Sequence, residues 1–211
     1  MGIKKNKIVL LGDTHGVDYV IDEVYREYIS TGQAERIIHL GDLGFVNSWK
    51  RLVRKYSPEE IQVIAGNHDE YNWIAQNNPP HYLGDFGLVP GTEDVFFIRG
   101  AWSIDQRFRK VNVSWWEAEE LDLSQRQECT ELYLKIKPRV ILSHDCPQFI
   151  INSLHPNSAF LTNTSQLLEH LHDLHEPEEW YFGHHHLPFT CNKGNTTFRC
   201  LNINETLLVK V

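Results

Sequence analysis

Five short apolar runs, each followed by polar residues that can bind a metal, constrain this 211-residue chain more than any other feature. The runs are rich in isoleucine, valine and leucine, and continuously apolar segments of this length predict strands buried on both faces. In α/β proteins, ligands bind beyond the carboxyl ends of such strands. The five polar endings are Asp13-Thr14-His15, Gly41-Asp42, Gly66-Asn67-His68-Asp69, His144, and Gly183-His184-His185-His186.

Two of these endings pair metal-binding side chains at a spacing of two residues. In an extended chain, side chains two residues apart point to the same side. We therefore expect Asp13 to face the same way as His15, and His184 the same way as His186. Carboxylate and imidazole together suit first-row divalent ions such as zinc, manganese and iron. The endings predict a metal site at one edge of a sheet.

The ordered set of endings resembles the motifs of the calcineurin-like metallophosphoesterases. That family's pattern runs Asp-x-His, Gly-Asp, Gly-Asn-His-Asp/Glu, a histidine after a strand, and Gly-His-x-His, and here it extends from residue 12 to 186. The string Trp102-Ser103-Ile104-Asp105 is similar to small stand-alone members from bacteria and bacteriophages. The resemblance implies one domain, residues 1–211, with an α/β fold: a four-layer α-β-β-α sandwich of two mixed sheets flanked by helices.

The resemblance also implies two divalent metal ions, with manganese expected first and iron, zinc or nickel as alternatives. Carried over residue by residue, the ligands form two sets that share a carboxylate: Asp13, His15 and His186 for one ion, Asn67, His144 and His184 for the other, and Asp42 as the bridge. Two ions roughly 3.5–4 Å apart can share a hydroxide that attacks a phosphoryl group. We therefore expect a phosphodiesterase acting on a nucleotide or another small phosphodiester. The alternatives are a phosphomonoesterase or protein phosphatase, and a non-catalytic metal-binding scaffold.

His68 is the candidate catalytic residue, beside the implied ions but not bound to them. Its unperturbed pKa of ~6.5 suits a general acid that protonates the leaving oxygen. Many family members place a second acid three residues after the Gly-Asp aspartate to orient this histidine, and Phe45 stands there instead. The sequence leaves two alternatives open: support from another group, of which Asp69 is the nearest in sequence, or a less strongly supported acid.

A basic and aromatic stretch, residues 99–110, supplies the candidate substrate contacts. The guanidinium groups of Arg107 and Arg109 match the geometry of a phosphate, and Trp102 can stack on a base. We expect residues of about 100–120 to form a cap over the metals. A solvated loop with one buried tryptophan is the alternative.

The formal net charge of −8 is a poor match to an extended nucleic-acid-binding surface, which needs a basic face. The longest apolar runs are too short to cross a bilayer, and no signal peptide or Cys-x-x-Cys pair is present. We therefore expect a cytoplasmic protein with reduced thiols, with a disulfide between Cys191 and Cys200 disfavoured. The sequence does not indicate an oligomeric state.

Strand-like runs alternate with helical patterns at 17–30, 49–56, 124–136 and 164–175, which favours α/β layering. Residues 196–204 and 206–211 are predicted to form hairpin strands, with turns at 192–195 and 204–205. The remaining histidines are expected to be structural. His39 should be buried in a strand, His185 should point away from the metals, and His170, His172 and His175 should lie on a solvated helix face.

Overall fold

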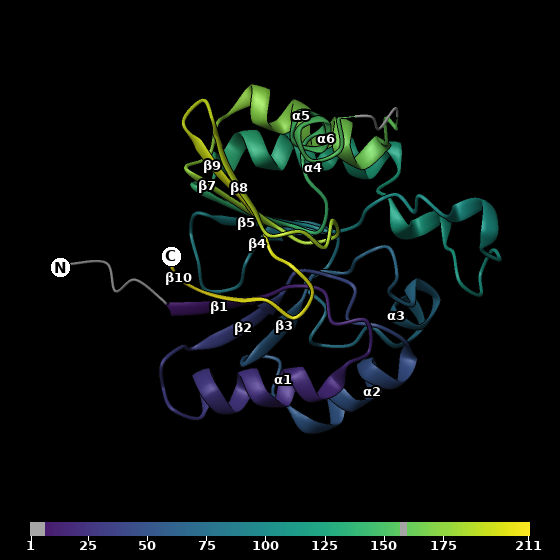
Figure 1. Cartoon of the computed structure of the whole chain (residues 1–211), viewed down its shortest axis with the longest axis vertical. Helices are drawn as coiled ribbons and strands as arrows, with labels where there is room; N and C mark the ends of the chain where they lie inside the picture. The colour runs from purple at the N-terminus through teal and green to yellow at the C-terminus, as the bar shows by residue number, and fades with distance from the viewer. Residues whose placement is uncertain (1–6, 157–159) are drawn as a thin grey trace.

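The structure is a computed structural model that describes residues 7–156 and 160–211, and it contains two mixed β-sheets packed face to face (Figure 1). The first sheet has the strand order β10-β1-β2-β3, with bounds β1 (Lys7–Leu11), β2 (Arg36–His39), β3 (Ile61–Val63) and β10 (Thr206–Lys210). The second has the order β4-β5-β6-β7-β9-β8, with bounds β4 (Phe86–Leu88), β5 (Val95–Ile98), β6 (Val140–Ser143), β7 (Glu179–Phe182), β8 (Phe189–Lys193) and β9 (Thr196–Cys200). The central strands of both sheets are parallel, and antiparallel strands lie at the edges.

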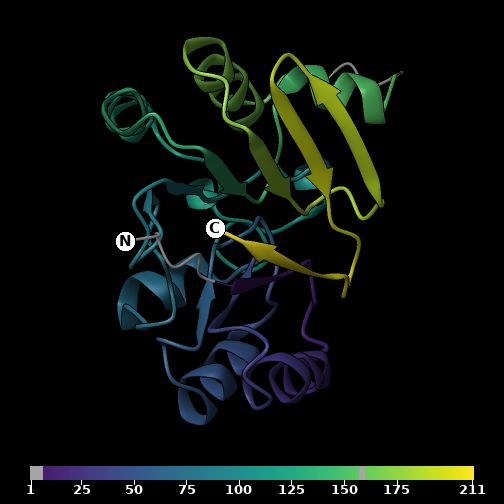
Figure 2. The same ribbon diagram turned by 90° about the vertical axis from the view of Figure 1, so that its left-hand side faces the viewer.

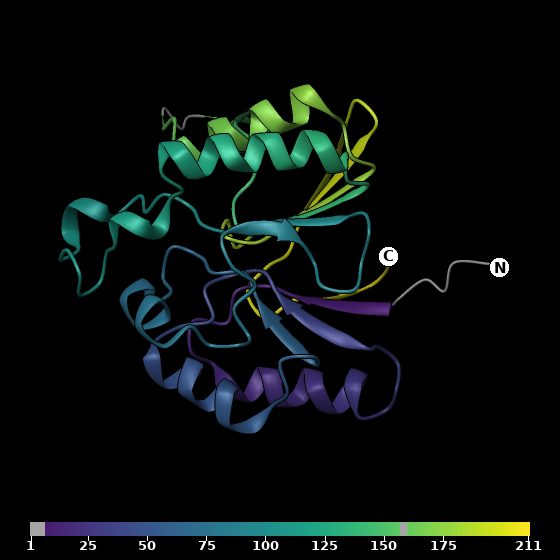
Figure 3. The same cartoon turned by 180° about the vertical axis from the view of Figure 1, so that it is seen from behind.

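Helices cover the outer face of each sheet (Figures 1 and 3). Next to the first sheet lie α1 (Asp18–Val24), continued by the π-helical turn η1 (Tyr25–Ile29), and α2 (Val46–Lys55). Next to the second lie α4 (Leu123–Ile136), α5 (Gln148–Leu154) and α6 (Asn163–Leu174). α3 (Tyr71–Asn77) follows β3, and the short 3-10 turns η2 (Gln106–Phe108) and η3 (Glu117–Glu119) belong to a segment that projects from the body (Figure 1). The predicted four-layer sandwich is confirmed.

Three apolar layers hold the sandwich together, and β1 shows how the sequence builds them. Val9 and Leu11 pack toward α1 and α2, whereas Ile8 and Leu10 pack between the two sheets. A third cluster fills the space between the second sheet and its helices. Because a parallel strand in this position is buried on both faces, its sequence is apolar throughout rather than alternating. Full burial of one such side chain stabilises the fold by about 1.5–3 kcal/mol.

The predicted helices are present, with small shifts at their ends. α4 and α6 begin one residue before the predicted starts, and each is opened by a capping box, from Asp122 with Gln125 and from Thr162 with Ser165. In a capping box the side chain of the first residue accepts from the backbone N–H of the residue three positions later. The side chain of that later residue accepts from the backbone N–H of the first, so two otherwise unbonded N–H groups are satisfied. Thr162 also lines the cavity at the carboxyl ends of the strands.

The C-terminal segment differs from the prediction in one respect. β8 and β9 do form an antiparallel hairpin, as expected from the 192–195 turn. The chain then leaves the second sheet, and β10 pairs antiparallel with β1 of the first (Figure 2). The second predicted hairpin is therefore wrong, because the 204–205 turn connects two sheets rather than two neighbouring strands. This turn is held to the first sheet by backbone bonds from Asn204 N to Asp13 O and from Gly12 N to Glu205 O, both 2.9 Å.

Within the described residues, no helix is both long and apolar enough to cross a membrane. The cysteines in this part of the chain, Cys191 and Cys200 among them, are free thiols.

Candidate metal centre

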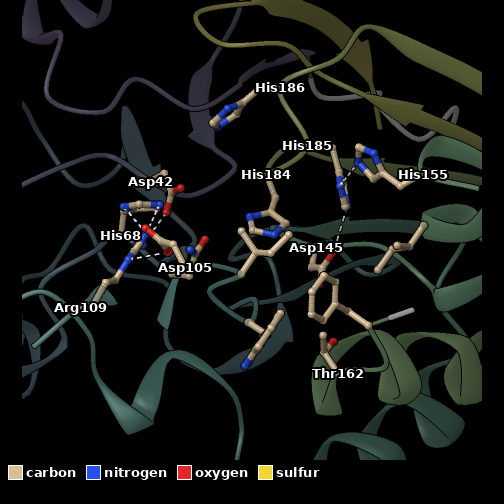
Figure 4. A pocket seen from close by; sticks show the side chains of 15 residues that line it. Asp42, His68, Asp105, Arg109, Asp145, His155, Thr162, His184, His185 and His186 are labelled. Atoms are coloured by element: carbon tan, nitrogen blue, oxygen red, sulfur yellow. Dashed lines mark hydrogen bonds and ion pairs between the residues drawn. The ribbon is translucent and has the colours of Figure 1, made fainter. Parts of the chain in front are cut away.

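The polar endings of five strands meet at one edge of the sandwich, where the two sheets face each other. Each ending follows the carboxyl end of a strand in a parallel part of its sheet, and such ends lie side by side. The strand ends contributed are Asp13 and His15 after β1, Asp42 after β2, Asn67 and His68 after β3, His144 after β6, and His184 and His186 after β7. The structure brings the seven residues expected as ligands together. His68 lies beside Asp42 (Figure 4).

Extended backbone does not produce this convergence, and that expectation is corrected. Four of the candidate ligands adopt positive φ angles in the left-handed region: 46° at His15, 54° at Asp42, 63° at His184 and 52° at His186. Non-glycine residues rarely take such angles, at a cost of order 1–3 kcal/mol each, and they do so where surrounding structure enforces them. β1 ends at Leu11 and β7 at Phe182, so tight loops rather than strand alternation aim these side chains.

The first cluster contains Asp13, His15, Asp42 and His186, whose candidate ligand atoms lie within 4.8 Å of one another. His186 Nε2 lies 2.9 Å from Asp13 Oδ2 and 2.9 Å from His15 Nε2. His15 Nε2 lies 3.8 Å from Asp13 Oδ2 and 3.9 Å from Asp42 Oδ2. These nitrogens and carboxylate oxygens converge on one point, as the ligands of a cation do.

The second cluster contains Asp42 again, with His144 and His184. His144 Nδ1 donates to the Leu40 carbonyl at 2.8 Å, which turns Nε2 toward Asp42 Oδ1 at 3.4 Å and Asn67 Oδ1 at 3.2 Å. Asp42 is buried, and its Oδ2 has no hydrogen-bond partner among the described residues. An unpartnered buried carboxylate oxygen is costly unless a cation faces it. Asp42 is therefore the shared member of both clusters.

Glycines in the motifs let these clusters assemble. A Cβ at Gly41 would overlap the ring of His144, and a Cβ at Gly66 would overlap the carboxylate of Asp42. Each glycine thus makes room for a candidate ligand from a different motif, which explains why glycine stands before the polar residue in these endings.

The charges of the two clusters are tightly coupled. Burial lowers the pKa of His184 to about 3, which keeps its imidazole in the neutral form that binds metals. Burial also opposes charge on His144, but the Asp42 carboxylate outweighs it and raises the pKa of His144 to about 10. Burial raises the pKa of Asp42, but the neighbouring imidazoles, His144 above all, outweigh this effect and hold the pKa below its usual value. The site therefore combines ionised carboxylates with imidazoles, a donor set that suits divalent first-row ions.

Asp69, the acid nearest to His68 in sequence, is engaged by other groups. Asp69 accepts from the backbone N–H groups of Gly44 (3.2 Å) and Gly66 (2.8 Å) and from Trp49 Nε1 (3.0 Å), so it braces the loops instead. Phe45 is 70% exposed.

The side chain beside His68 is that of Arg109. Arg109 Nη2 lies 2.7 Å from His68 Nε2, and Asp105 holds the same guanidinium through an ion pair of 2.7 Å at Nε. Burial lowers the pKa of His68, Asp42 raises it, and the Arg109 charge lowers it further. The contact to Arg109 joins the segment that follows β5 to the metal-binding loops.

A buried chain of hydrogen bonds, which no motif in the sequence indicated, orients Asn67. Glu119 accepts from the backbone N–H and the hydroxyl of Ser103, both at 2.8 Å, and the Ser103 Oγ accepts from Asn67 Nδ2 at 3.0 Å. All three side chains are buried. Because the amide nitrogen is bonded to Ser103, Asn67 Oδ1 points to the second cluster. A Trp-Ser dipeptide well before a glutamate is too ordinary a signal to reveal this arrangement.

A cavity of about 420 Å³ opens beside the clusters. Figure 4 shows Asp42, His68 and Arg109 on one side of it and Asp145 and Thr162 on the other. Of the three predicted substrate contacts, Trp102 and Arg109 line the cavity. Arg107 is not among the lining residues that the structure describes, and its guanidinium lies over the Phe108 ring at 4.6 Å.

His185 points away from both clusters, as its position predicts. Its Nε2 lies 3.1 Å from Asp145 Oδ1 and 3.3 Å from Cys146 Sγ, and its Nδ1 lies 3.3 Å from His155 Nε2. His39 is buried, with Thr14 Oγ1 at 3.0 Å and the Gly41 N–H bonded to its Nδ1. His172 is also buried rather than solvated, because its ring packs among Phe149, Trp180 and Phe198.

A two-sheet α/β sandwich with two clusters of metal-type ligands at one edge defines a metallophosphoesterase. The chain belongs to the calcineurin-like phosphoesterase superfamily, whose domain profile matches residues 7–205, and it is a hydrolase of phosphoesters. The family resemblance expected from the motifs is thereby confirmed. None of the curated proteins matches the chain significantly.

Solved structures share the fold at low sequence identity. TT1561 of Thermus thermophilus is 11% identical with a TM-score of 0.55, over 98% of this chain and 99% of that one. A putative 5'-nucleotidase from Staphylococcus aureus is 13% identical with a TM-score of 0.56, over 97% of this chain and 50% of that one. GAP50, the anchor in the inner membrane complex of Plasmodium, is 12% identical with a TM-score of 0.55, over 96% of this chain and 73% of that one.

Proposed function

We propose that this protein is a phosphodiesterase that works with two divalent metal ions, manganese being the first candidate. The observation that carries the proposal is the position of Asp42, which belongs to both ligand clusters and has a buried oxygen without a partner among the described residues. A carboxylate has two oxygens and brings negative charge between two cations, so Asp42 suits a bridge. A single-metal site would leave this sharing unexplained.

The residues present fit two ions. Asp13, His15 and His186 would hold the first, Asn67, His144 and His184 the second, with Asp42 common to both. Two such ions, when bound, clamp phosphoryl oxygens and lower the pKa of water from ~15.7 to about 7, so that hydroxide is available at neutral pH. Asn67 offers a neutral oxygen, which limits the negative charge that the site places on the second ion.

The chain's own residues supply the remaining chemistry. Arg109 is held by Asp105 with its guanidinium at the cavity wall, where it can bind a phosphoryl oxygen with charge-assisted hydrogen bonds. The His68 imidazole lies next to the Arg109 guanidinium, so it would lie close to a phosphoryl group bound there and can protonate the leaving oxygen. A phosphate bound by Arg109 would offset the guanidinium charge beside His68, which favours the protonated imidazole. Residues of about 100–120, which include Trp102 and Arg109, then act as a cap at one side of the site.

The charge of the cavity supports a diester over a monoester. Among the described residues that line it, Arg109 is the one lysine or arginine. A phosphodiester carries one negative charge, whereas a phosphomonoester at neutral pH carries nearly two. Besides the two proposed ions, the described lining of the cavity offers a single cationic side chain, which matches the lower charge of a diester. The cavity also continues from the clusters to the side chains of Trp102 and Phe160, which gives room for an ester group on that side.

The direct test is hydrolysis of matched chromogenic substrates. Protein stripped by a chelator is expected to be inactive, and reloading with manganese is expected to restore cleavage of bis(p-nitrophenyl) phosphate, at a higher kcat/KM than p-nitrophenyl phosphate. Metal analysis of the reloaded protein should give close to two ions per chain. A preference for the monoester would favour the phosphomonoesterase alternative. Two bound ions without turnover of either substrate would favour a scaffold.

Ser103→Ala is expected to weaken binding of the second ion by about 10–100-fold, the usual effect of losing a group that orients a ligand. The substitution removes the hydroxyl that holds the Asn67 amide and leaves Glu119 with one donor fewer. Calorimetric titration of the stripped protein with manganese measures both affinities. Loss of affinity at the second site alone marks a positioning role, whereas equal losses at both sites would mark a general structural defect.

Ser124→Ala is the matched control, because Ser124 is exposed and bonds to Glu128 on the surface. Its two affinities should equal those of the unchanged protein. Wild-type affinity in the Ser103 variant would show that the hydrogen-bond chain has no part in metal binding.

A further inference from the structure

The cavity beside the clusters has two chemically different halves. One half is formed by candidate metal ligands together with His68 and Arg109. The other half contains the apolar side chains of Trp102, Ile104, Ile151 and Phe160, with the polar residues Asp145, His155 and Thr162 at its edge. No step of phosphate hydrolysis uses the four apolar residues, so the apolar half calls for another explanation.

The apolar half is built mainly from two aromatic rings. Trp102 and Phe160 have ring centroids 5.1 Å apart and planes inclined by 39°. They come from distant parts of the sequence, Trp102 from the loop after β5 and Phe160 from the loop before α6. The two rings therefore pack against each other, and both line the cavity.

Hydrogen bonds hold the indole of Trp102 and the backbone at Phe160 in place. Trp102 Nε1 donates to Gln106 Oε1 at 3.1 Å, which sets the orientation of the indole. Gln148 Nε2 donates to the backbone carbonyl of Phe160 at 3.0 Å, and the Gln148 side chain also accepts from Ser165 Oγ at 2.6 Å. The surface is therefore prearranged rather than formed on binding, which reduces the ordering cost when a ligand lies on it.

Exposure at this wall is high for apolar residues. Ile104 is 67% exposed and Phe160 is 46% exposed, whereas Ile151 beneath them is 7% exposed. Apolar side chains that line a cavity together with a few converging polar groups are typical of small-molecule sites. Thr162 and His155 lie at the same side of the cavity and add polar groups at its edge (Figure 4).

We propose that this half of the cavity is a subsite for a flat aromatic group, the base of a nucleotide being the chemical class that fits it. The inference rests on the proposed phosphodiesterase function, since the ester phosphate would lie at the metal clusters while the base stacks on Trp102 and Phe160. Stacking suits a planar ring more than an alkyl chain, because the face of the ligand then meets the faces of the aromatic side chains. Such stacking tolerates different bases, since each has a π face.

The test compares two monophosphates that differ by the base alone. Adenosine 5'-monophosphate and ribose 5-phosphate are titrated calorimetrically into the manganese-loaded protein. We expect the nucleotide to bind roughly ten times more tightly or better, the scale of one base stacked on an aromatic side chain. Trp102→Ala should remove most of that difference, and Trp102→Phe should keep much of it. Phe108→Ala is the matched control, because Phe108 is 78% exposed on the same projecting segment and does not line the cavity.

Equal affinities for the two ligands would overturn the base subsite while leaving the phosphodiesterase proposal intact. If Trp102→Ala lowered the affinities for both ligands equally, the base subsite would also be overturned, because the indole would then support the whole site and not the base alone. Tighter binding of butyl phosphate than of the nucleotide would assign the apolar half to an alkyl group instead. Failure of every phosphate ligand to bind the two-metal protein would remove the proposed function and this inference with it.

Discussion

Replacing Asp42 with asparagine is expected to lower the metal content from two ions to one or none and to reduce kcat by about 10³-fold or more, at the upper end of the effect of losing one preorganised electrostatic group. Asparagine offers one oxygen and no charge, so it cannot serve two cations. The isosteric amide can keep the bond from the His68 backbone N–H to Oδ1, which is 2.8 Å long, so the loop conformation is preserved. Elemental analysis and steady-state kinetics on bis(p-nitrophenyl) phosphate measure the two effects.

Asp94→Asn is the matched control for this substitution. Asp94 is half-exposed and pairs with Arg139 at 2.8 Å, far from the clusters in the fold. The control should keep both ions and its turnover, and circular dichroism should show both variants folded. An Asp42→Asn protein that retained two ions and near-normal turnover would rule out a bridging role for this carboxylate.

Replacing His68 with alanine is expected to lower kcat by about 10²–10⁴-fold for substrates with a poor leaving group, the usual contribution of a general acid. The metals should remain bound, because the bond to Asp42 comes from the backbone of His68 rather than from its imidazole. A diester with an alkyl leaving group needs a proton on the departing oxygen, whereas p-nitrophenolate leaves readily without one. The loss of turnover should therefore be much larger for the alkyl diester.

This dependence on the leaving group separates proton donation from substrate binding. If His68 only helped to bind the phosphate, both diesters would lose turnover equally. His170→Ala provides a control, because His170 is exposed on α6, which covers the outer face of the second sheet. Retained turnover of the alkyl diester by the His68 variant would take this histidine out of the acid role.

Much of the fold was predictable, because strand burial and ligand placement are encoded locally. A run such as residues 8–11 is apolar throughout, and only a strand with a layer on each side buries it completely. The partner of β10 was not predictable in the same way. A turn at Asn204 and Glu205 looks alike in sequence whether it joins two neighbouring strands or passes from one sheet to the other, and long-range pairing with β1 decided the outcome.

The directions in which the candidate ligand side chains point also could not be predicted from a local sequence pattern. Alternation in extended chain was the wrong reason to expect these side chains at one edge, since His15, His184 and His186 adopt left-handed backbone angles. His184 and His186 belong to different clusters. Left-handed angles are enforced by neighbouring loops, and no periodicity in the sequence reports them.

The sequence by itself determined the family, the sandwich fold and the order of the metal-type residues, because each depends on short segments in which a strand and its polar ending are adjacent along the chain. The tertiary structure alone decided the neighbours of those residues. Asp69 bonds to the loop backbone, and Arg109 lies beside His68. Glu119 is linked through Ser103 to Asn67, and Trp102 packs against Phe160. The physical reason is that these contacts join segments from different layers and loops, whose distance and orientation are set by packing of the whole sandwich and by no local pattern.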